Sequence, residues 1–354
     1  MILKNKKVLV TGGTGSMGKT FVRRVLTGEL GLPKKVIVYS RDEAKQHDMR
    51  MAYLHKTVST DEVIFRNFMN VLEFRIGDVR DYAAVSAAVR DADIVVNAAA
   101  LKQVPSCEYF PEEAVLTNCI GAMNIVRAIQ NNRYPVETVV AISTDKACKP
   151  VNVMGMTKAV QERIFVGANV LNPDTRFIGV RYGNVLASRG SVIPLFHEQI
   201  RNGGPVTITA PQMTRFLLSL DQAVDTVFAA VKGAKPGEIY VPNAPSATVI
   251  NIAKALIGNR KIPTRITGVR PGEKLHEIMV SEEEVHHCVK RGAWYAIRPM
   301  LPELTAKSKP EPNALKREFS SADTVLSLAG TVKLLKEHRL MPGDAGPGDG
   351  ELLR

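Results

Sequence analysis

Apolar runs that alternate with amphipathic stretches fill the first half of the chain and most constrain its fold. Six runs have the length and β-branched composition of strands: KKVLVTG, KVIVYS, EFRIGDV, DIVVNAA, VETVVAIST and TRFIGVRYGNV. Buried strands separated by helical segments are typical of a parallel sheet covered on both faces. The sequence therefore predicts an α/β protein with a Rossmann-type, doubly wound parallel sheet and a smaller C-terminal α/β lobe.

The regular alternation ends near residue 190, where short segments rich in Pro and Gly begin. Insertions after the later strands of such a sheet usually build a substrate-holding lobe. We therefore expect a nucleotide-binding domain over 1–190 with parts of 205–235 returning to it, a substrate lobe over 190–285, a C-terminal extension over 286–340 and a disordered tail over 341–354.

Composition narrows the class of protein. The start of the chain leads directly into a strand, and no apolar run approaches the roughly 20 residues that span a bilayer. We expect a cytoplasmic protein without a membrane segment. The four cysteines have no metal-ligand spacing, so we expect reduced thiols and no metal.

The formal net charge of +12 is compatible with an anionic partner. A nucleic acid is disfavoured because the basic residues are scattered and are not interleaved with aromatic residues, which make up only 6% of the chain. An anionic small substrate fits the charge better.

The first strand runs into a glycine-rich turn, VLVTGGTGSMG, over residues 8 to 18. Glycines at this spacing allow a tight turn and a close approach of the backbone to a pyrophosphate at a helix N-terminus. The residues predicted to hold a dinucleotide here are Gly12, Thr14, Gly15, Ser16, Met17 and Gly18.

The ends of the next strands predict the rest of the dinucleotide site. The second strand ends at Ser40, Arg41 and Asp42. An arginine at this place can pair with a 2′-phosphate, which favours NADP over NAD; the alternative is a solvated loop residue. The small or acidic residues at the next strand ends would border the cofactor, or would only pack helix against strand; they are Asp78, Val79, Ala98 and Ala99.

Six stretches together resemble the extended short-chain dehydrogenase/reductase superfamily, and more narrowly the UDP-N-acetylglucosamine 4,6-dehydratases of bacterial capsule, O-antigen and flagellar-sugar synthesis. They are TGGTGSMG, YSRDE, AALKQVPSCEYFPEEAVLTN, ISTDKACKPVNVMGMTK, RYGNVLASRGSVIPLF and VRPGEKLHE. The likeness is closest to the soluble, C5-inverting capsular type. It implies an NADP-dependent lyase that acts on UDP-N-acetylglucosamine and assembles as a homo-oligomer.

The reaction implied by the resemblance oxidises C4, eliminates water across C5 and C6, and returns hydride to C6, giving a UDP-2-acetamido-2,6-dideoxy-4-hexulose. It needs an acid and a base beside the Ser/Thr pair that binds the hydroxyl. By resemblance, Asp145 is the acid for the C6 oxygen and Lys146 the C5 base. The pKa of Lys146 would then have to fall, through burial or through Lys158. The alternative is an ordinary surface ion pair.

Short-chain dehydrogenases carry a tyrosine four residues before the lysine that corresponds to Lys158. Met154 stands at this place and has no proton to exchange. Thr144 can relay the proton of the C4 hydroxyl but cannot be its final base, so we predict that a lysine takes this part. The lysines able to do so are Lys146, Lys158 and Lys102; by resemblance, Lys158 also binds the nicotinamide ribose.

Inversion at C5 needs a proton donor on the opposite face of the sugar, and Lys102 and Cys107 are the predicted groups. Cys107 is about as well explained as a buried structural thiol. By resemblance, the substrate-binding residues are Lys102, Asn184, Ser191, Arg215, Arg270 and Glu273. Each arginine alone is more often a surface residue, and the apolar residues after Ser191 could equally be core.

Two other functions remain open. One is a UDP-sugar 4-epimerase or reductase on the same scaffold, which would need no second acid or base at Asp145 and Lys146. The other is a non-catalytic NADP-binding regulator, suggested by Met154. Dehydration in D₂O would leave deuterium at C5, whereas epimerisation would leave none and a regulator would not change the substrate.

Overall fold

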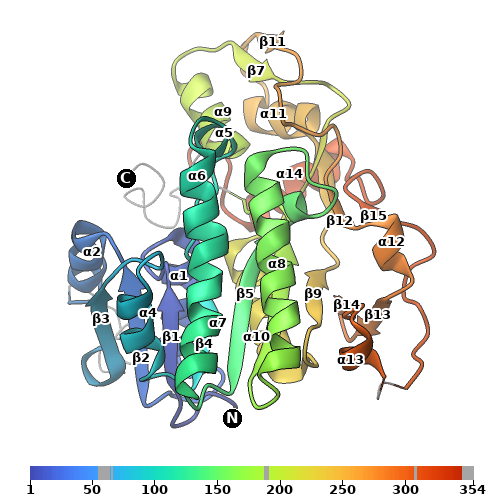
Figure 1. Cartoon of the computed structure of the whole chain (residues 1–354). Helices are drawn as coiled ribbons and strands as arrows, with labels where there is room; N and C mark the ends of the chain where they lie inside the picture. The colour runs from blue at the N-terminus through green and yellow to red at the C-terminus, as the bar shows by residue number, and fades with distance from the viewer. Residues whose placement is uncertain (55–63, 65–66, 187–190, 307–308, 345–354) are drawn as a thin grey trace.

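The computed structural model describes residues 1–54, 64, 67–186, 191–306 and 309–344 (Figure 1). Its main sheet has nine strands in the order β13-β14-β9-β6-β5-β4-β1-β2-β3. The seven strands from β9 to β3 run parallel to their neighbours, and β14 and β13 are antiparallel. Their bounds are β1 Lys7–Thr11, β2 Lys35–Ser40, β3 Leu72–Ile76, β4 Ile94–Asn97, β5 Thr138–Thr144, β6 Arg176–Tyr182, β9 Ile239–Pro242, β13 Cys288–Arg291 and β14 Trp294–Ile297.

Helices cover both faces of this sheet. On one face α4, α7 and α8 pack side by side, and on the other α1 packs against α10. Two apolar cores result, one on each face, because the central strands are buried on both sides. The predicted α/β fold class is confirmed. The helix bounds are α1 Ser16–Leu26, α2 Glu43–Leu54, α4 Tyr82–Val89, α7 Gly121–Asn132, α8 Val153–Leu171 and α10 Leu220–Gly233.

A smaller lobe lies beyond the carboxyl ends of the parallel strands, at the top of Figure 1. Its apolar core joins three helices through side chains such as Phe196, Leu256 and Leu335. Its elements are α9 Val192–Arg201, β7 Val206–Ile208, β8 Thr214–Phe216, β10 Ser246–Thr248, α11 Val249–Ile257, β11 Thr264–Ile266 and α14 Leu328–Glu337. Ligands of doubly wound sheets bind at the same carboxyl edge, so the lobe borders the expected site.

Several segments assigned from sequence to the lobe or extension lie elsewhere. Strand β9 pairs with β6 in the main sheet, and β14 and β13 extend that sheet. An apolar run such as IYVP predicts a buried strand but does not tell which sheet receives it. The domain boundaries stay predictions. Of the tail predicted over 341–354, residues 345–354 lie outside the described part, whereas Met341 packs against the apolar core of the lobe.

Short elements connect these parts. Strand β12 (Ile278–Val280) pairs antiparallel with β15 (Phe319–Ser320), which brings the C-terminal extension beside the loop before β12. The others are α5 Val104–Tyr109, α6 Pro111–Ala114, the π-helical turn η1 Val115–Ile120, the 3₁₀ turn η2 Asp145–Ala147, α12 Glu282–Val285 and α13 Pro302–Thr305. No helix in the described ranges is long and apolar enough to cross a bilayer.

Candidate active site

The glycine-rich turn joins β1 to α1 with little free space. Gly12 has φ +66°, and a Cβ atom there would lie 2.7 Å from the backbone of Ala99. A Cβ atom on Gly18 would lie 2.6 Å from Gly13. Gly15, which precedes α1, is exposed and no side chain caps the helix there. The turn thus presents the N-terminus of α1 without a side-chain cap from Gly15, and a helix N-terminus of this kind binds a pyrophosphate.

At the end of β2 the predicted residues differ in exposure. Ser40 is buried and its hydroxyl accepts a hydrogen bond from Gln46. Arg41 is exposed, with its guanidinium 3.6 Å from Asp78 Oδ2. Asp42 accepts a hydrogen bond from the Lys45 N–H in the first turn of α2. Arg41 is therefore at the surface, beside an acidic group and free to turn toward a ligand.

The other predicted cofactor residues lie at the same edge. The Ala98 N–H donates to the carbonyl of Thr11, and Ala99 lies against Gly12. Val79 is buried and contacts Gly121 of α7, which is the packing alternative considered for it. Their roles in binding stay predictions.

Asp145 and Lys146 form a buried pair directly after β5. The Asp145 side chain is 0% exposed and its Oδ1 accepts from Lys146 Nζ at 3.0 Å and from the Thr144 hydroxyl at 3.0 Å. The surface ion pair considered as an alternative is therefore excluded. Helix α8 packs closely against the turn that holds this pair: a Cβ atom added to Gly155 of α8 would lie only 2.2 Å from the Lys146 carbonyl oxygen.

A second carboxylate completes this group. Glu277, which is 3% exposed, places Oε1 3.1 Å from Lys146 Nζ and 3.8 Å from Arg215 Nε. Asp145 Oδ2 and Glu277 Oε2 are buried and have no hydrogen-bond partner among the described residues. Burial of unpaired polar atoms is costly, so the site is arranged for a group that the protein itself does not supply.

The protonation of the pair differs from the expected one. Burial alone would lower the pKa of Lys146, but Asp145 and Glu277 outweigh it and the pKa of Lys146 is raised. The expectation of a lowered pKa for Lys146 is thus wrong, because the lysine lies between two carboxylates. Burial, aided by Glu277, raises the pKa of Asp145, which favours the protonated acid.

Lys158 has the lowered pKa instead. It lies on α8 with its ammonium group donating to the Ile142 carbonyl and to Gln161 Oε1, both neutral acceptors. Burial lowers its pKa to about 8. Lys158 therefore loses its proton more readily than Lys146; the third candidate, Lys102, is exposed.

Met154 and Cys107 lie together in a small apolar cluster with Ala114. The Cys107 side chain is 0% exposed, and burial raises the pKa of its thiol. This geometry favours the structural alternative for Cys107; its role as a proton donor stays a prediction. Met154 is also buried, so the place of the missing tyrosine is packed with apolar groups.

The predicted substrate residues occupy two places. Asn184, Ser191 and Arg215 line one small pocket beneath α9. Asn184 Oδ1 and Ser191 Oγ are buried there without a hydrogen-bond partner among the described residues. Arg270 is exposed in the loop before β12, and its carbonyl accepts from the Glu273 N–H at 3.1 Å. The structure thus brings three of these residues together and leaves Arg270 at the surface.

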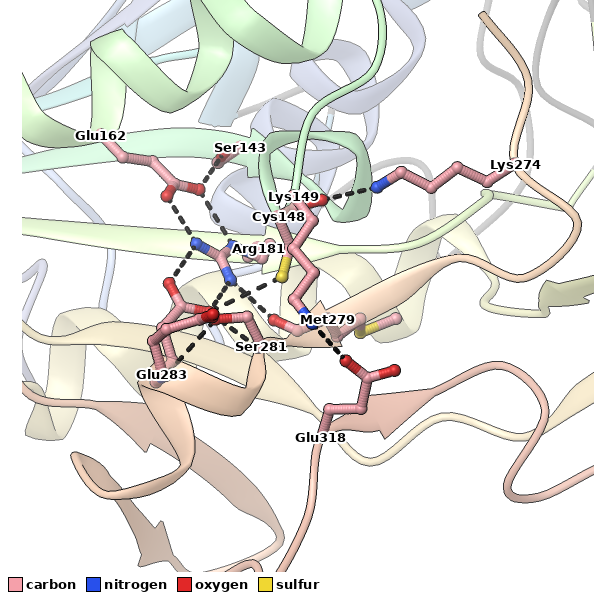
Figure 2. Close-up of polar contacts among 11 residues, drawn as sticks. Ser143, Cys148, Lys149, Glu162, Arg181, Lys274, Met279, Ser281, Glu283 and Glu318 are labelled. Carbon is pink, nitrogen blue, oxygen red and sulfur yellow. Dashed lines mark hydrogen bonds and ion pairs between the residues drawn. The ribbon is translucent and has the colours of Figure 1, made fainter.

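Behind η2 lies a second buried charge cluster, shown in Figure 2. Arg181 of β6 donates to both carboxylate oxygens of Glu162 and of Glu284 and to the carbonyl of Met279. Glu162 also accepts from the Ser143 hydroxyl. The cluster borders a cavity of about 300 Å³ and ties β5, β6, α8 and α12 together.

Sequence reasoning missed Glu277 and this arginine cluster. The motif VRPGEKLHE contains Glu277 and was used for the resemblance, so its second glutamate was available as a signal. No comparable signal joins Arg181 to two glutamates far away in the chain. In the described ranges no group of three His, Cys, Asp or Glu side chains could hold a metal ion, and the absence of a metal stays a prediction.

Residues 8–299 match the family of polysaccharide biosynthesis proteins. The chain is 42% identical to a protein named UDP-N-acetylglucosamine 4,6-dehydratase (inverting) from Campylobacter jejuni, covering 89% of each. It is 43% identical to a protein named UDP-glucose 4-epimerase from Rickettsia bellii, covering 83% of each.

A solved structure named Pen, from Bacillus thuringiensis, has a TM-score of 0.85 and 32% identity, and the match covers 96% of this chain and 100% of that one. The resemblance drawn from the six motifs is confirmed, since the match includes all of them. Sequence and sheet order agree that the chain belongs to the polysaccharide biosynthesis protein family, within the extended short-chain dehydrogenases/reductases.

Proposed function

We propose that the chain is an NADP-dependent UDP-N-acetylglucosamine 4,6-dehydratase of the C5-inverting kind, with UDP-2-acetamido-2,6-dideoxy-4-hexulose as product. The observation that carries the proposal is the buried Asp145–Lys146 pair beside Thr144. The 42% identity to a relative of this name supports the substrate class. A 4-epimerase moves hydride only at C4 and has no use for a second acid and base.

The pair performs the elimination. Lys146 in its amine form removes the C5 proton, and Asp145 in its carboxylic acid form protonates the departing C6 oxygen, so one water leaves across C5 and C6. When bound, the nicotinamide dinucleotide supplies a hydride acceptor for C4 and a hydride donor for C6. Thr144 binds the C4 hydroxyl, and Lys158, whose pKa burial lowers to about 8, takes its proton in place of the tyrosine.

The turn at Gly15 and the small residues at Ala98 and Ala99 fit a dinucleotide at the carboxyl edge. Arg41 supports NADP over NAD, because its exposed guanidinium can pair with a 2′-phosphate. An Arg41→Ala variant should lose affinity for NADP about tenfold or more and keep its affinity for NAD. Equal losses for both dinucleotides would remove the argument for NADP.

We also propose that the enzyme is a cytoplasmic homo-oligomer that serves bacterial surface polysaccharide synthesis, such as capsule or O-antigen. Exposed apolar residues on η1 and α8, including Leu116, Met156 and Val160, support an interface at these helices. Light scattering of the purified protein tests the assembly, and a monomer at micromolar concentration would contradict it.

The alternative of a UDP-sugar 4-epimerase is favoured by the name of the Rickettsia bellii relative. Incubation with UDP-N-acetylglucosamine in D₂O, followed by mass spectrometry and NMR, separates the functions. We expect a product that has lost water and carries deuterium at C5. An epimerised sugar without C5 deuterium would establish the alternative, and unchanged substrate would indicate a regulator.

A further inference from the structure

Glu277 holds a position that the elimination as described does not explain. Lys146 Nζ lies 3.0 Å from Asp145 Oδ1 and 3.1 Å from Glu277 Oε1, so the ammonium group is shared almost equally. Both carboxylates are almost fully buried, and both have one oxygen without a partner among the described residues. A structural ion pair would need only one of them.

The charged groups around Glu277 come from three segments. Lys146 comes from η2, Arg215 from β8, and Lys274 from the loop before β12. Lys274 Nζ donates to the Cys148 carbonyl at 2.6 Å, and burial lowers its pKa. Although burial opposes it, Lys146 and Arg215 lower the pKa of Glu277. Glu277 therefore stays ionised while its neighbours titrate.

The C-terminal extension fixes Glu277 in this place. The Ser321 N–H donates to the Glu277 carbonyl at 2.8 Å, and the Glu277 N–H donates to Ser321 Oγ at 2.9 Å. Ser321 is completely buried and is also bonded to Thr214, whose hydroxyl meets His276 Nδ1 at 2.8 Å. These two hydrogen bonds hold the backbone of Glu277 against the C-terminal extension and so fix the place of its carboxylate.

We infer that Glu277 is a positioning residue that sets the pH range over which Asp145 and Lys146 share one proton. The inference rests on the proposed dehydratase function. The reactive form needs a protonated Asp145 and a neutral Lys146. Transfer of one proton from Lys146 Nζ to Asp145 Oδ1, across 3.0 Å, breaks one N–H bond, forms one O–H bond and gives this form. Glu277, held ionised beside Arg215 and 3.1 Å from Lys146 Nζ, disfavours loss of a proton from either group, so the pair keeps its shared proton up to a higher pH.

The sign of the effect follows from the charge. The Glu277 carboxylate raises the pKa of both Asp145 and Lys146, although burial is the larger influence on each. Removing it lowers both pKa values. Asp145 and Lys146 titrate as one coupled pair in the pH profile of kcat, to which Lys158 also contributes, so the part of the profile that belongs to the pair moves to lower pH.

The experiment compares Glu277→Gln and Glu277→Asp with the wild type. We expect the pH optimum of kcat for dehydration to fall by about one unit or more in Glu277→Gln and by less in Glu277→Asp, where a shorter carboxylate remains. Glu238→Gln is the matched control, because Glu238 is 1% exposed and pairs with Arg291, away from this site. Its optimum should not move.

A readout without activity keeps the inference separate from the proposed function. In protein with ¹³C-labelled aspartate carboxyls, the resonance of Asp145, assigned with Asp145→Asn, should titrate at lower pH in Glu277→Gln than in the wild type. An unchanged titration and an unmoved optimum would overturn the inference, even if the wild type dehydrates the sugar. If Glu277→Gln does not fold, Glu277→Asp decides by the same two measurements. A wild type that titrates as expected but does not dehydrate would overturn only the proposed function.

Discussion

The two buried charge clusters beside η2 differ in how completely they are paired. In the arginine cluster, each nitrogen of Arg181 donates to a carboxylate oxygen, and one donates also to a carbonyl. In the candidate active site, Asp145 and Glu277 each keep one buried carboxylate oxygen without a hydrogen-bond partner among the described residues. Buried charges that satisfy one another hold a structure, whereas incompletely satisfied ones are typical of functional sites.

The difference teaches that burial and charge alone do not identify an active site. Both clusters lie within a few residues of each other along β5 and η2, and Cys148 belongs to the surroundings of the arginine cluster. What separates them is the supply of hydrogen bonds. Substitutions in the cluster of Asp145 and Glu277 should therefore change activity, whereas substitutions in the arginine cluster should change stability.

The largest expected effect is on activity. Asp145→Asn removes the proposed acid without changing the shape of the side chain, so kcat for dehydration should fall by about 10²–10⁴-fold. The free energy of unfolding should stay within about 1 kcal/mol or rise, because a buried, incompletely paired carboxyl group is lost. Steady-state kinetics measures kcat, and urea unfolding measures the free energy of unfolding. A variant that is unstable but keeps its kcat would reverse the comparison.

Arg181→Met tests whether the arginine cluster stabilises the fold. Glu162 and Glu284 would be left buried without their cation, which should lower the free energy of unfolding by about 3–5 kcal/mol. Molecules that remain folded should keep the pH optimum of the wild type. Urea unfolding provides the measurement, with Arg41→Ala as a control at an exposed arginine. A loss below about 1 kcal/mol would show that the cluster is not structural.

Lys158 extends the comparison, because it is a buried cation whose hydrogen-bond acceptors among the described residues, the Ile142 carbonyl and Gln161 Oε1, are neutral. Burial lowers its pKa from 10.5 to about 8, so the unfolded chain holds the proton more tightly. Its contribution to stability should therefore rise between about pH 8 and pH 10.5, by up to about 3 kcal/mol. Unfolding of wild type and Lys158→Met at both pH values measures it; a difference that does not change with pH would contradict it.

The smallest effect is expected at Ser321. Ser321→Ala removes the hydroxyl that accepts from the Glu277 N–H, at a cost of about 1–2 kcal/mol in unfolding free energy. Because the β12–β15 pairing remains, kcat should fall only a few-fold. Ser320→Ala is a neighbouring control whose hydroxyl bonds only to Ala322 among the described residues. Equal effects of the two substitutions would remove the special role of Ser321.

The sheet and the strand-end residues could be predicted from the sequence because each depends on local patterns. The apolar runs gave six strands within two or three residues, and parallel strands bring their carboxyl ends to one edge. The charge state of Lys146 could not be predicted, because one of its two carboxylates comes from the loop before β12. The ion pairs of Arg181 could not be predicted for the same reason, because its two glutamate partners lie on α8 and α12.

The contact between Glu277 and Ser321 has a consequence for how the enzyme is made. During synthesis the glycine-rich turn and the first six parallel strands, the last of which ends at Tyr182, leave the ribosome long before residue 321. The acid–base group remains unfinished until residue 321 has emerged and has docked on Glu277. A chain that ends before residue 321 therefore lacks the two hydrogen bonds that hold the backbone of Glu277.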